Sequence, residues 1–133
     1  MNLVEQLLKA DKTTLELETG EFLSSRLQHF LKAKEPVPVK IRQIPARKAT
    51  DIYGMAFDKK GNKDASKWYD VCLMYCVQGI TDPSLKDDGL MKKFGAATPK
   101  DLAEKLFDNE VTDIANAIAA LGDPGDSEDD VKN

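Results

Sequence analysis

The sequence predicts an α+β fold dominated by helices, with about five or six short helices packed on a small two-stranded antiparallel sheet. Three observations lead to this prediction. Apolar residues recur at spacings of three and four in most segments, which is typical of amphipathic helices. Two short segments alternate instead between apolar and polar residues, as half-buried strands do. Capping and turn residues separate the segments, so that each is short.

The composition fits one folded domain followed by an acidic tail. The chain has 133 residues, of which 41% are hydrophobic and 32% charged. We assign residues 1–122 to the domain. Residues 123–133 hold five acidic residues and one lysine, and we expect them to be disordered because they offer few apolar groups. The tail accounts for the whole formal net charge of −4, and the balanced remainder argues against nucleic-acid binding by phosphate neutralisation.

The N-terminal part predicts a helix and then the first strand. Leucines in residues 3–8 share one side of a helical turn or two. Residues 13–18 (TTLELE) alternate strictly, with Leu15 and Leu17 on one face and acidic residues on the other. We therefore expect a half-buried strand that ends at Gly20.

A second helix and the second strand follow. A serine in residues 24–25 can cap the helix, because its hydroxyl can accept a hydrogen bond from a free backbone N–H. The expected buried stripe of this helix is Leu27, Phe30 and Leu31. Val39 and Ile41 then predict a strand that pairs antiparallel with residues 13–18. Pro38 has no N–H to donate, so it should lie at a sheet edge or at the start of the strand.

The middle of the chain predicts a helix, a loop and a central helix. Residues 46–57 have helical spacing and follow a proline. Residues 58–66 (DKKGNKDAS) read as a polar surface loop. Residues 68–77 form the most apolar helix of the chain, which therefore belongs in the centre of the fold. Residues 81–83 (TDP) predict a turn, and residues 85–94 a short amphipathic link.

The end of the domain predicts two more helices. Thr98 is placed as an N-cap, and Pro99 fits the first helical position, where a missing N–H does no harm. Asn109 has the character of a second cap, and residues 111–121 keep helical spacing up to Gly122. Because only one or two residues join these helices, we expect them to fold back on each other.

Residues suited to catalysis or metal binding are sparse. His29 has no evident partner. Cys72 and Cys76 share one helix face, where side chains rarely reach disulfide geometry, so we expect buried, reduced thiols. A zinc site would need carboxylates in addition to these three side chains. We predict no enzyme, no catalytic residues, no metal and no cofactor.

Protein binding is the better supported class of function. The basic residues of segment 32–48 are either ordinary solvated charges or a positive patch for an acidic partner surface. The apolar stripes of the last two helices are either core or a groove for a partner helix, and the alanines of residues 115–120 would allow a helix to approach closely. The candidate partner-binding residues are Lys40, Arg42, Arg47, Lys48, Leu102, Phe107, Ile114 and Ile118.

Several strings in this sequence resemble a known family. They are the opening LLKADKTTLELE, the long stretch from ITDPSLKDDGLMKKFGAATPKDLAEKLF to IANAIAALG, and the terminal DDVKN. The most distinctive part is KFG-x-x-TP followed by Asp101 and Leu102. In these strings the chain resembles the XkdN-like tail assembly chaperones of contractile-tailed phages and PBSX-type prophages. The likeness spans most of the chain and is weakest in residues 46–67.

The resemblance implies a non-enzymatic chaperone in the cytoplasm of the bacterial host that is absent from the mature virion. Such a chaperone binds and solubilises the tape measure protein, which is long and largely helical, and helps recruit tail tube protein to it. The resemblance implies no catalytic residues and no nucleic-acid or membrane partner. Self-association is left open.

Two other functions stay open beside the chaperone. One is a small bacterial or phage protein-interaction or regulatory module. The other is a small-molecule-binding domain near Trp68 and Tyr69. A pocket with convergent polar groups near His29 or the cysteines would favour an enzyme, whereas a filled core with an apolar surface groove would favour the chaperone.

Overall fold

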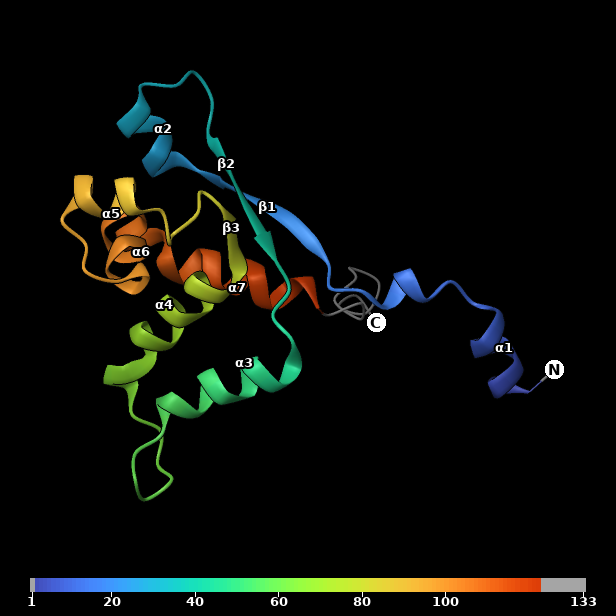
Figure 1. Cartoon of the computed structure of the whole chain (residues 1–133). Coiled ribbons are helices and arrows are strands. Elements are labelled where there is room, and N and C mark those ends of the chain that lie inside the picture. The colour runs from blue at the N-terminus through green and yellow to red at the C-terminus, as the bar shows by residue number, and fades with distance from the viewer. Residues whose placement is uncertain (1, 123–133) are drawn as a thin grey trace, which may run out of the picture.

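The computed structural model of the chain describes residues 2–122 and confirms a helix-dominated α+β fold (Figure 1). In chain order the helices and strands are α1 (Leu3–Lys9), β1 (Thr19–Ser24), α2 (Ser25–Leu31), β2 (Val37–Arg42), α3 (Ala46–Tyr53), α4 (Trp68–Gly79), β3 (Ile80–Asp82), α5 (Asp88–Phe94), α6 (Pro99–Phe107) and α7 (Val111–Leu121). Four short 3-10 turns lie between them, η1 (Lys12–Leu15), η2 (Gly54–Ala56), η3 (Ala65–Lys67) and η4 (Asp108–Glu110). The expected tail, residues 123–133, lies outside the described residues.

The sheet has three antiparallel strands in the order β1-β2-β3, where two were predicted. The strand prediction for residues 13–18 is wrong, because η1 occupies part of this segment and Leu15 is 83% exposed. Strand β1 begins at Thr19 instead and runs through Gly20, which pairs with Ile41. A Cβ on Gly20 would lie 3.0 Å from Cδ2 of Leu121, so the glycine leaves room for the end of α7 against the strand.

The third strand explains how β2 can contain a proline. Strand β3 pairs with β2 only at Lys40 and Ile41. Pro38 lies nearer the start of β2, opposite Leu23 of β1 and outside the residues that pair with β3. Its missing N–H therefore breaks no hydrogen bond between β2 and β3. The turn prediction for residues 81–83 missed β3, because three residues are too few to show an alternating pattern.

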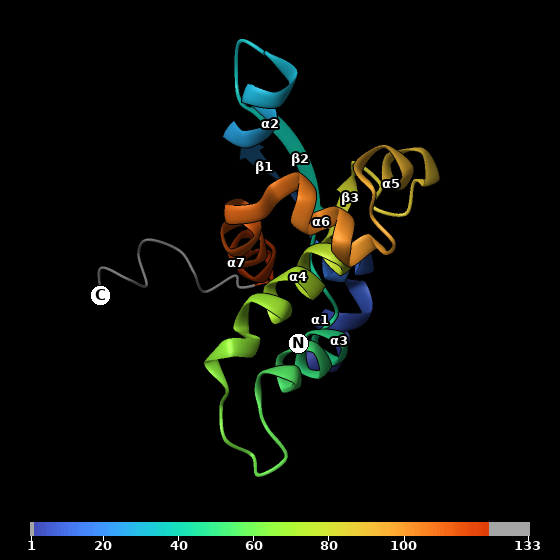
Figure 2. The same ribbon diagram turned by 90° about the vertical axis from the view of Figure 1, so that its left-hand side faces the viewer.

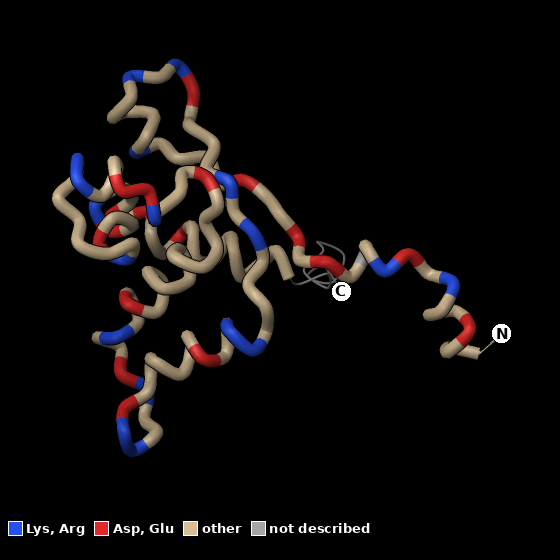
Figure 3. The backbone as a smooth tube through the Cα atoms, in the orientation of Figure 1, with Lys and Arg blue, Asp and Glu red and all other residues tan. Residues whose placement is uncertain are grey.

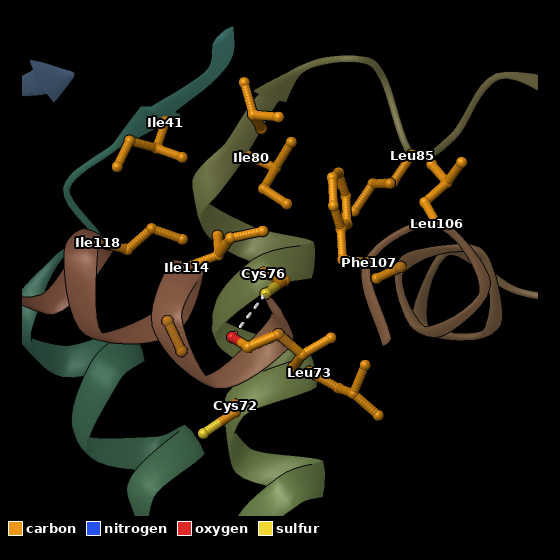
Figure 4. Close-up of a cluster of buried hydrophobic side chains, with 14 of the residues drawn as sticks. Ile41, Cys72, Leu73, Cys76, Ile80, Leu85, Leu106, Phe107, Ile114 and Ile118 are labelled. Atoms are coloured by element: carbon orange, nitrogen blue, oxygen red, sulfur yellow. Dashed lines mark hydrogen bonds between the residues drawn. The ribbon is translucent and has the colours of Figure 1, made fainter. Parts of the chain in front are cut away.

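Helix α4 lies at the centre of the fold, as predicted, with α6 and α7 packed against it (Figure 4). Its buried side chains meet apolar residues of both helices and of the sheet. A Cβ on Gly79 would lie 2.5 Å from Cδ1 of Ile118, so glycine permits the close approach of α7 at this point. The last two helices thus find their main partner in α4 rather than in each other.

Local capping signals are confirmed at some helix ends and wrong at two. Gly122 follows α7 with a φ of −89°, so it is not the left-handed stop expected of a glycine there. The Thr98 hydroxyl accepts a hydrogen bond from the Asp101 N–H at 3.1 Å, and Pro99 is the first residue of α6. Asn109 is not a cap, because it lies inside η4. The Val111 N–H donates to the Asp108 carbonyl instead, so a preceding helical turn takes the place of a side-chain cap at the start of α7.

Helix α2 begins after its predicted serine cap, since the Ser24 hydroxyl accepts a hydrogen bond from the Leu27 N–H at 3.0 Å. Only part of its predicted buried stripe is correct. Leu27 is buried, but Phe30 is 54% and Leu31 59% exposed. Helix α2 lies at one end of the molecule, where it contacts α6 and β2, and the centroid of the Phe30 ring lies 5.8 Å from that of Phe94 in α5 (Figure 1).

Helix α1 projects away from the rest of the fold on an extended segment (Figure 1). The helix is confirmed, but it contributes no buried residue. No helix in residues 2–122 is long and apolar enough to span a membrane.

Candidate functional site

Helices α3, α4 and α7 border a largely apolar groove made of two neighbouring hollows of about 220 and 240 Å³. Tyr75 and Ala119 line both hollows, so the two lie next to each other. Helix α3 contributes Ala46, Ala49 and Tyr53; α4 contributes Trp68, Val71, Cys72 and Tyr75; α7 contributes Ala115, Asn116, Ile118 and Ala119. Gln43, Ile44 and Gly122 lie at the second hollow. We call this surface the α3–α4–α7 groove.

Small side chains on two helices give the groove its shape. Ala46 and Ala49 are three residues apart on α3, and Ala115 and Ala119 are four apart on α7, so each pair shares one helix face. Because alanine ends at Cβ, α3 and α7 leave space between them above α4. An entering helix could bring its backbone close to both walls.

Aromatic rings form one end of the groove. The Tyr53 ring centroid lies 6.1 Å from that of Trp68 at an angle of 85°, and 5.5 Å from that of Phe57. The Lys63 Nζ lies 5.0 Å from the centroid of a Trp68 ring, in a cation–π position. These edge-on contacts hold the rings at the mouth of the groove, where they offer apolar surface to a partner.

The two cysteines are buried and free, as predicted (Figure 4). The Cys76 thiol donates to the Val111 carbonyl with an S···O distance of 3.6 Å. Burial raises the pKa of Cys76 to about 12 and also raises the pKa of Cys72. Both groups therefore stay neutral thiols near neutral pH and are unsuited to nucleophilic catalysis.

His29 borders a different hollow, of about 210 Å³, between α2, α5 and α6. Its other lining residues are Arg26, Leu27, Phe30, Phe94, Lys105 and Leu106, so no carboxylate accompanies the imidazole there. Within residues 2–122 no group of three or more His, Cys, Asp or Glu side chains could hold a metal ion. The geometry around His29 thus offers no acid–base pair for catalysis.

The basic run of the sequence does not form one positive patch. Lys40 stands opposite Glu21 of β1 and Asp82 of β3, so carboxylate residues flank it on both neighbouring strands. The Arg42 Nε donates to the Gln78 carbonyl at 3.4 Å. Figure 3 shows basic segments spread from the loop after α2, along β2, to the start of α3, with acidic segments between them.

The eight candidate partner-binding residues divide into two groups. Lys40, Arg42, Arg47 and Lys48 are exposed. Leu102, Phe107, Ile114 and Ile118 are at most 1% exposed and belong to the core, although Ile118 also lies at the floor of the α3–α4–α7 groove. Only this isoleucine among the apolar candidates borders a surface that a partner could reach.

Sequence reasoning missed most of the groove, because its walls come from segments about seventy residues apart along the chain. The partial signal was the alanine-rich face of residues 115–120, which does contribute Ala115 and Ala119. The matching alanines of α3 carried no such signal, since nothing in their local spacing says which helix they will face.

Comparison with known proteins gives the family. No curated protein and no solved structure matches the chain. Residues 4–133 match the family described as phage XkdN-like tail assembly chaperone protein, in agreement with the strings noted above. The match covers nearly the whole chain, so this protein belongs to the phage XkdN-like tail assembly chaperone family.

Proposed function

We propose that this chaperone binds an amphipathic helical segment of the tape measure protein in the α3–α4–α7 groove, keeps it soluble, and helps recruit tail tube protein to it. The chaperone catalyses no reaction in this role. It acts in the cytoplasm of the host cell and is absent from the finished virion. The observation that supports this best is an open, apolar groove walled by alanines and ended by aromatic rings.

The dimensions of the groove suit a short stretch of helix. The groove-lining residues at the end of α7 run from Ala115 to Gly122, which corresponds to about 10 Å at 1.5 Å per residue. A partner helix lying along them would present about two turns, with apolar residues at spacings of three and four toward the groove. A contact of this length is small, so we expect it to be reversible, as a chaperone that later leaves must be.

Arg47 and Lys48 can steer a partner toward the groove. Both are exposed at the start of α3, on the side of the helix turned away from the groove-lining Ala46 and Ala49. Exposed charges near an interface mainly affect association rate rather than affinity. A partner segment that carries acidic residues beside its apolar face should therefore associate faster.

The test is co-expression with the tape measure protein of the same genome segment, followed by co-purification. We expect a soluble complex, and aggregation of the tape measure protein when the chaperone is absent. Ala119→Arg places a long charged side chain in the groove and should abolish co-purification. Ala120→Arg is the matched control, because Ala120 is also exposed on α7 but does not line the groove.

Two results would contradict the proposal. One is a tape measure protein that stays soluble without this chain and forms no complex with it. The other is equal binding by the Ala119 and Ala120 variants, which would place the contact elsewhere. Recruitment is tested separately, by asking whether tail tube protein joins the purified complex but not the chaperone alone. Mass spectrometry of purified virions should then detect no chaperone.

A further inference from the structure

We infer that residues 2–18 form an exchange arm, whose helix α1 docks in the α3–α4–α7 groove of a second copy of this chain. The inference rests on three features of the described residues. These are the exposed apolar face of α1, the direction in which the arm leaves the body, and the size of the groove.

Helix α1 carries an apolar face that no other part of residues 2–122 covers. Leu3, Val4, Leu7 and Leu8 are 66%, 64%, 62% and 79% exposed. Leu3 and Leu7 are four residues apart, as are Val4 and Leu8, so all four gather on one side of the helix. A seven-residue helix is unstable alone in water, because its few hydrogen bonds cannot offset the entropy of nucleation. This helix therefore needs a packing partner.

The arm leaves the body at the edge of the groove but points away from it (Figures 1 and 2). The Gln43 N–H donates to the Glu18 carbonyl at 2.7 Å, and the Glu18 N–H donates to the Gln43 Oε1 at 3.1 Å. Gln43 also lines the second hollow. This pair of bonds holds the root of the arm in an outward direction. The arm would have to reverse beyond Glu18 to enter its own groove, whereas it can reach a neighbouring molecule as it stands.

The middle of the arm is ordered in the same outward course. The Asp11 Oδ1 accepts hydrogen bonds from the Thr13 N–H at 3.0 Å and from the Thr13 hydroxyl at 2.8 Å, which caps η1. Leu15, the last residue of η1, and Leu17 are 83% and 41% exposed and add apolar surface to the arm. These side chains would be covered together with α1 when two molecules lie against each other.

The groove and α1 match in size. Seven helical residues span about 10 Å, and the groove-lining residues from Ala115 to Gly122 at the end of α7 span about the same length. Glu5 and Lys9 lie on the side of α1 away from its leucines, so both charges stay in water when the apolar face docks.

Every copy carries one arm and one groove, so reciprocal exchange closes a two-fold dimer in which neither feature is left unpaired. The same groove is the one proposed above for the tape measure helix. A client helix would then displace the neighbour's arm and separate the dimer. The dimer itself needs no client, so the experiments below use the full chain alone and can fail or succeed independently of the proposed function.

The first test is the mass of the full chain in solution, by size-exclusion chromatography with light scattering over a range of concentrations. The chain has a mass of 14.7 kDa, and we expect twice this value at high concentration. Leu7→Asp should raise the dissociation constant of the dimer by at least about 100-fold, because each dimer loses two buried leucines and gains two buried charges. Gln6→Asp adds the same charge to α1 outside the apolar face and should leave the dimer intact.

Cross-linking decides between the neighbour's groove and the chain's own. In a variant with Leu7→Cys and Ala119→Cys, mild oxidation should produce a covalent dimer on a non-reducing gel. Leu7→Cys with Ala120→Cys is the control and should cross-link far more slowly, since Ala120 lies outside the groove. The inference is overturned by a monomer at all concentrations, or by a disulfide that forms within one chain.

Discussion

Glu110, the last residue of η4, ties the turn before α7 to the start of α2, although these segments are far apart in the sequence. Its Oε1 accepts a hydrogen bond from the Ser24 hydroxyl at 2.6 Å, across 86 residues of chain. Its Oε2 accepts from the N–H groups of Ser25 and Arg26 at 3.0 and 3.2 Å. The carboxylate thus satisfies free donors at the N-terminus of a helix, where a negative charge is also favoured by the helix dipole.

Replacing Glu110 by alanine should therefore destabilise the whole domain. Three hydrogen bonds to a charged acceptor are lost, and the buried Ser24 hydroxyl loses the acceptor for its proton while it still accepts from Leu27. Hydrogen bonds to charged groups contribute about 1.5–3 kcal/mol each when buried, and less at this partly exposed site. We expect a loss of about 2–4 kcal/mol in the free energy of unfolding. For a domain of this size, each kcal/mol lost lowers the midpoint temperature of thermal unfolding by about 4 °C, so this midpoint should fall by roughly 8–16 °C.

The assay is urea and thermal unfolding followed by circular dichroism. Glu104→Ala is the matched control, because Glu104 is an exposed acidic residue of α6. The double variant Ser24→Ala with Glu110→Ala should lose less than the sum of the single losses, since both remove the same bond. A Glu110→Ala protein as stable as the Glu104→Ala control would refute this account of how α2 is held.

Three further predictions concern the core and its thiols. Leu102→Ala, at 0% exposure, should lower the free energy of unfolding by about 2–5 kcal/mol in urea titrations, whereas Leu8→Ala at 79% exposure should change that of the monomer by less than about 0.5 kcal/mol. Gly79→Ala should cost about 1–3 kcal/mol, because its Cβ would overlap Ile118; unchanged stability would show that α7 can shift freely. The folded-state pKa of Cys76 is raised from 9.0 to about 12, so the folded protein holds this proton more tightly than the unfolded chain does. The stability that this bound proton contributes is therefore fully present below pH 9 and is lost as the pH rises toward 12. The free energy of unfolding of Cys76→Ala should accordingly fall less steeply over that pH range than that of the unmodified protein.

Sequence reasoning could not place strand β1 or the α3–α4–α7 groove. The alternation in residues 13–18 was genuine, yet no element covers its leucines, and the adjacent segment through Gly20 pairs with β2 instead. The alternation of a strand shows which residues can share a face but not whether a neighbour will cover it. In the same way, Lys40 belonged to a basic run in the sequence, whereas the sheet register sets it between Glu21 and Asp82.

The sequence by itself determined where most helices begin and end. Thr98 with Pro99, and the serine before α2, act on backbone groups within three residues, so the signal and its target lie in one short segment. Tertiary structure alone decided which faces meet: the use of Glu110 as a cap for α2, the close contact of Gly79 with Ile118, and the α3–α4–α7 groove. These depend on contacts between residues from about forty to almost ninety positions apart, which local spacing cannot encode.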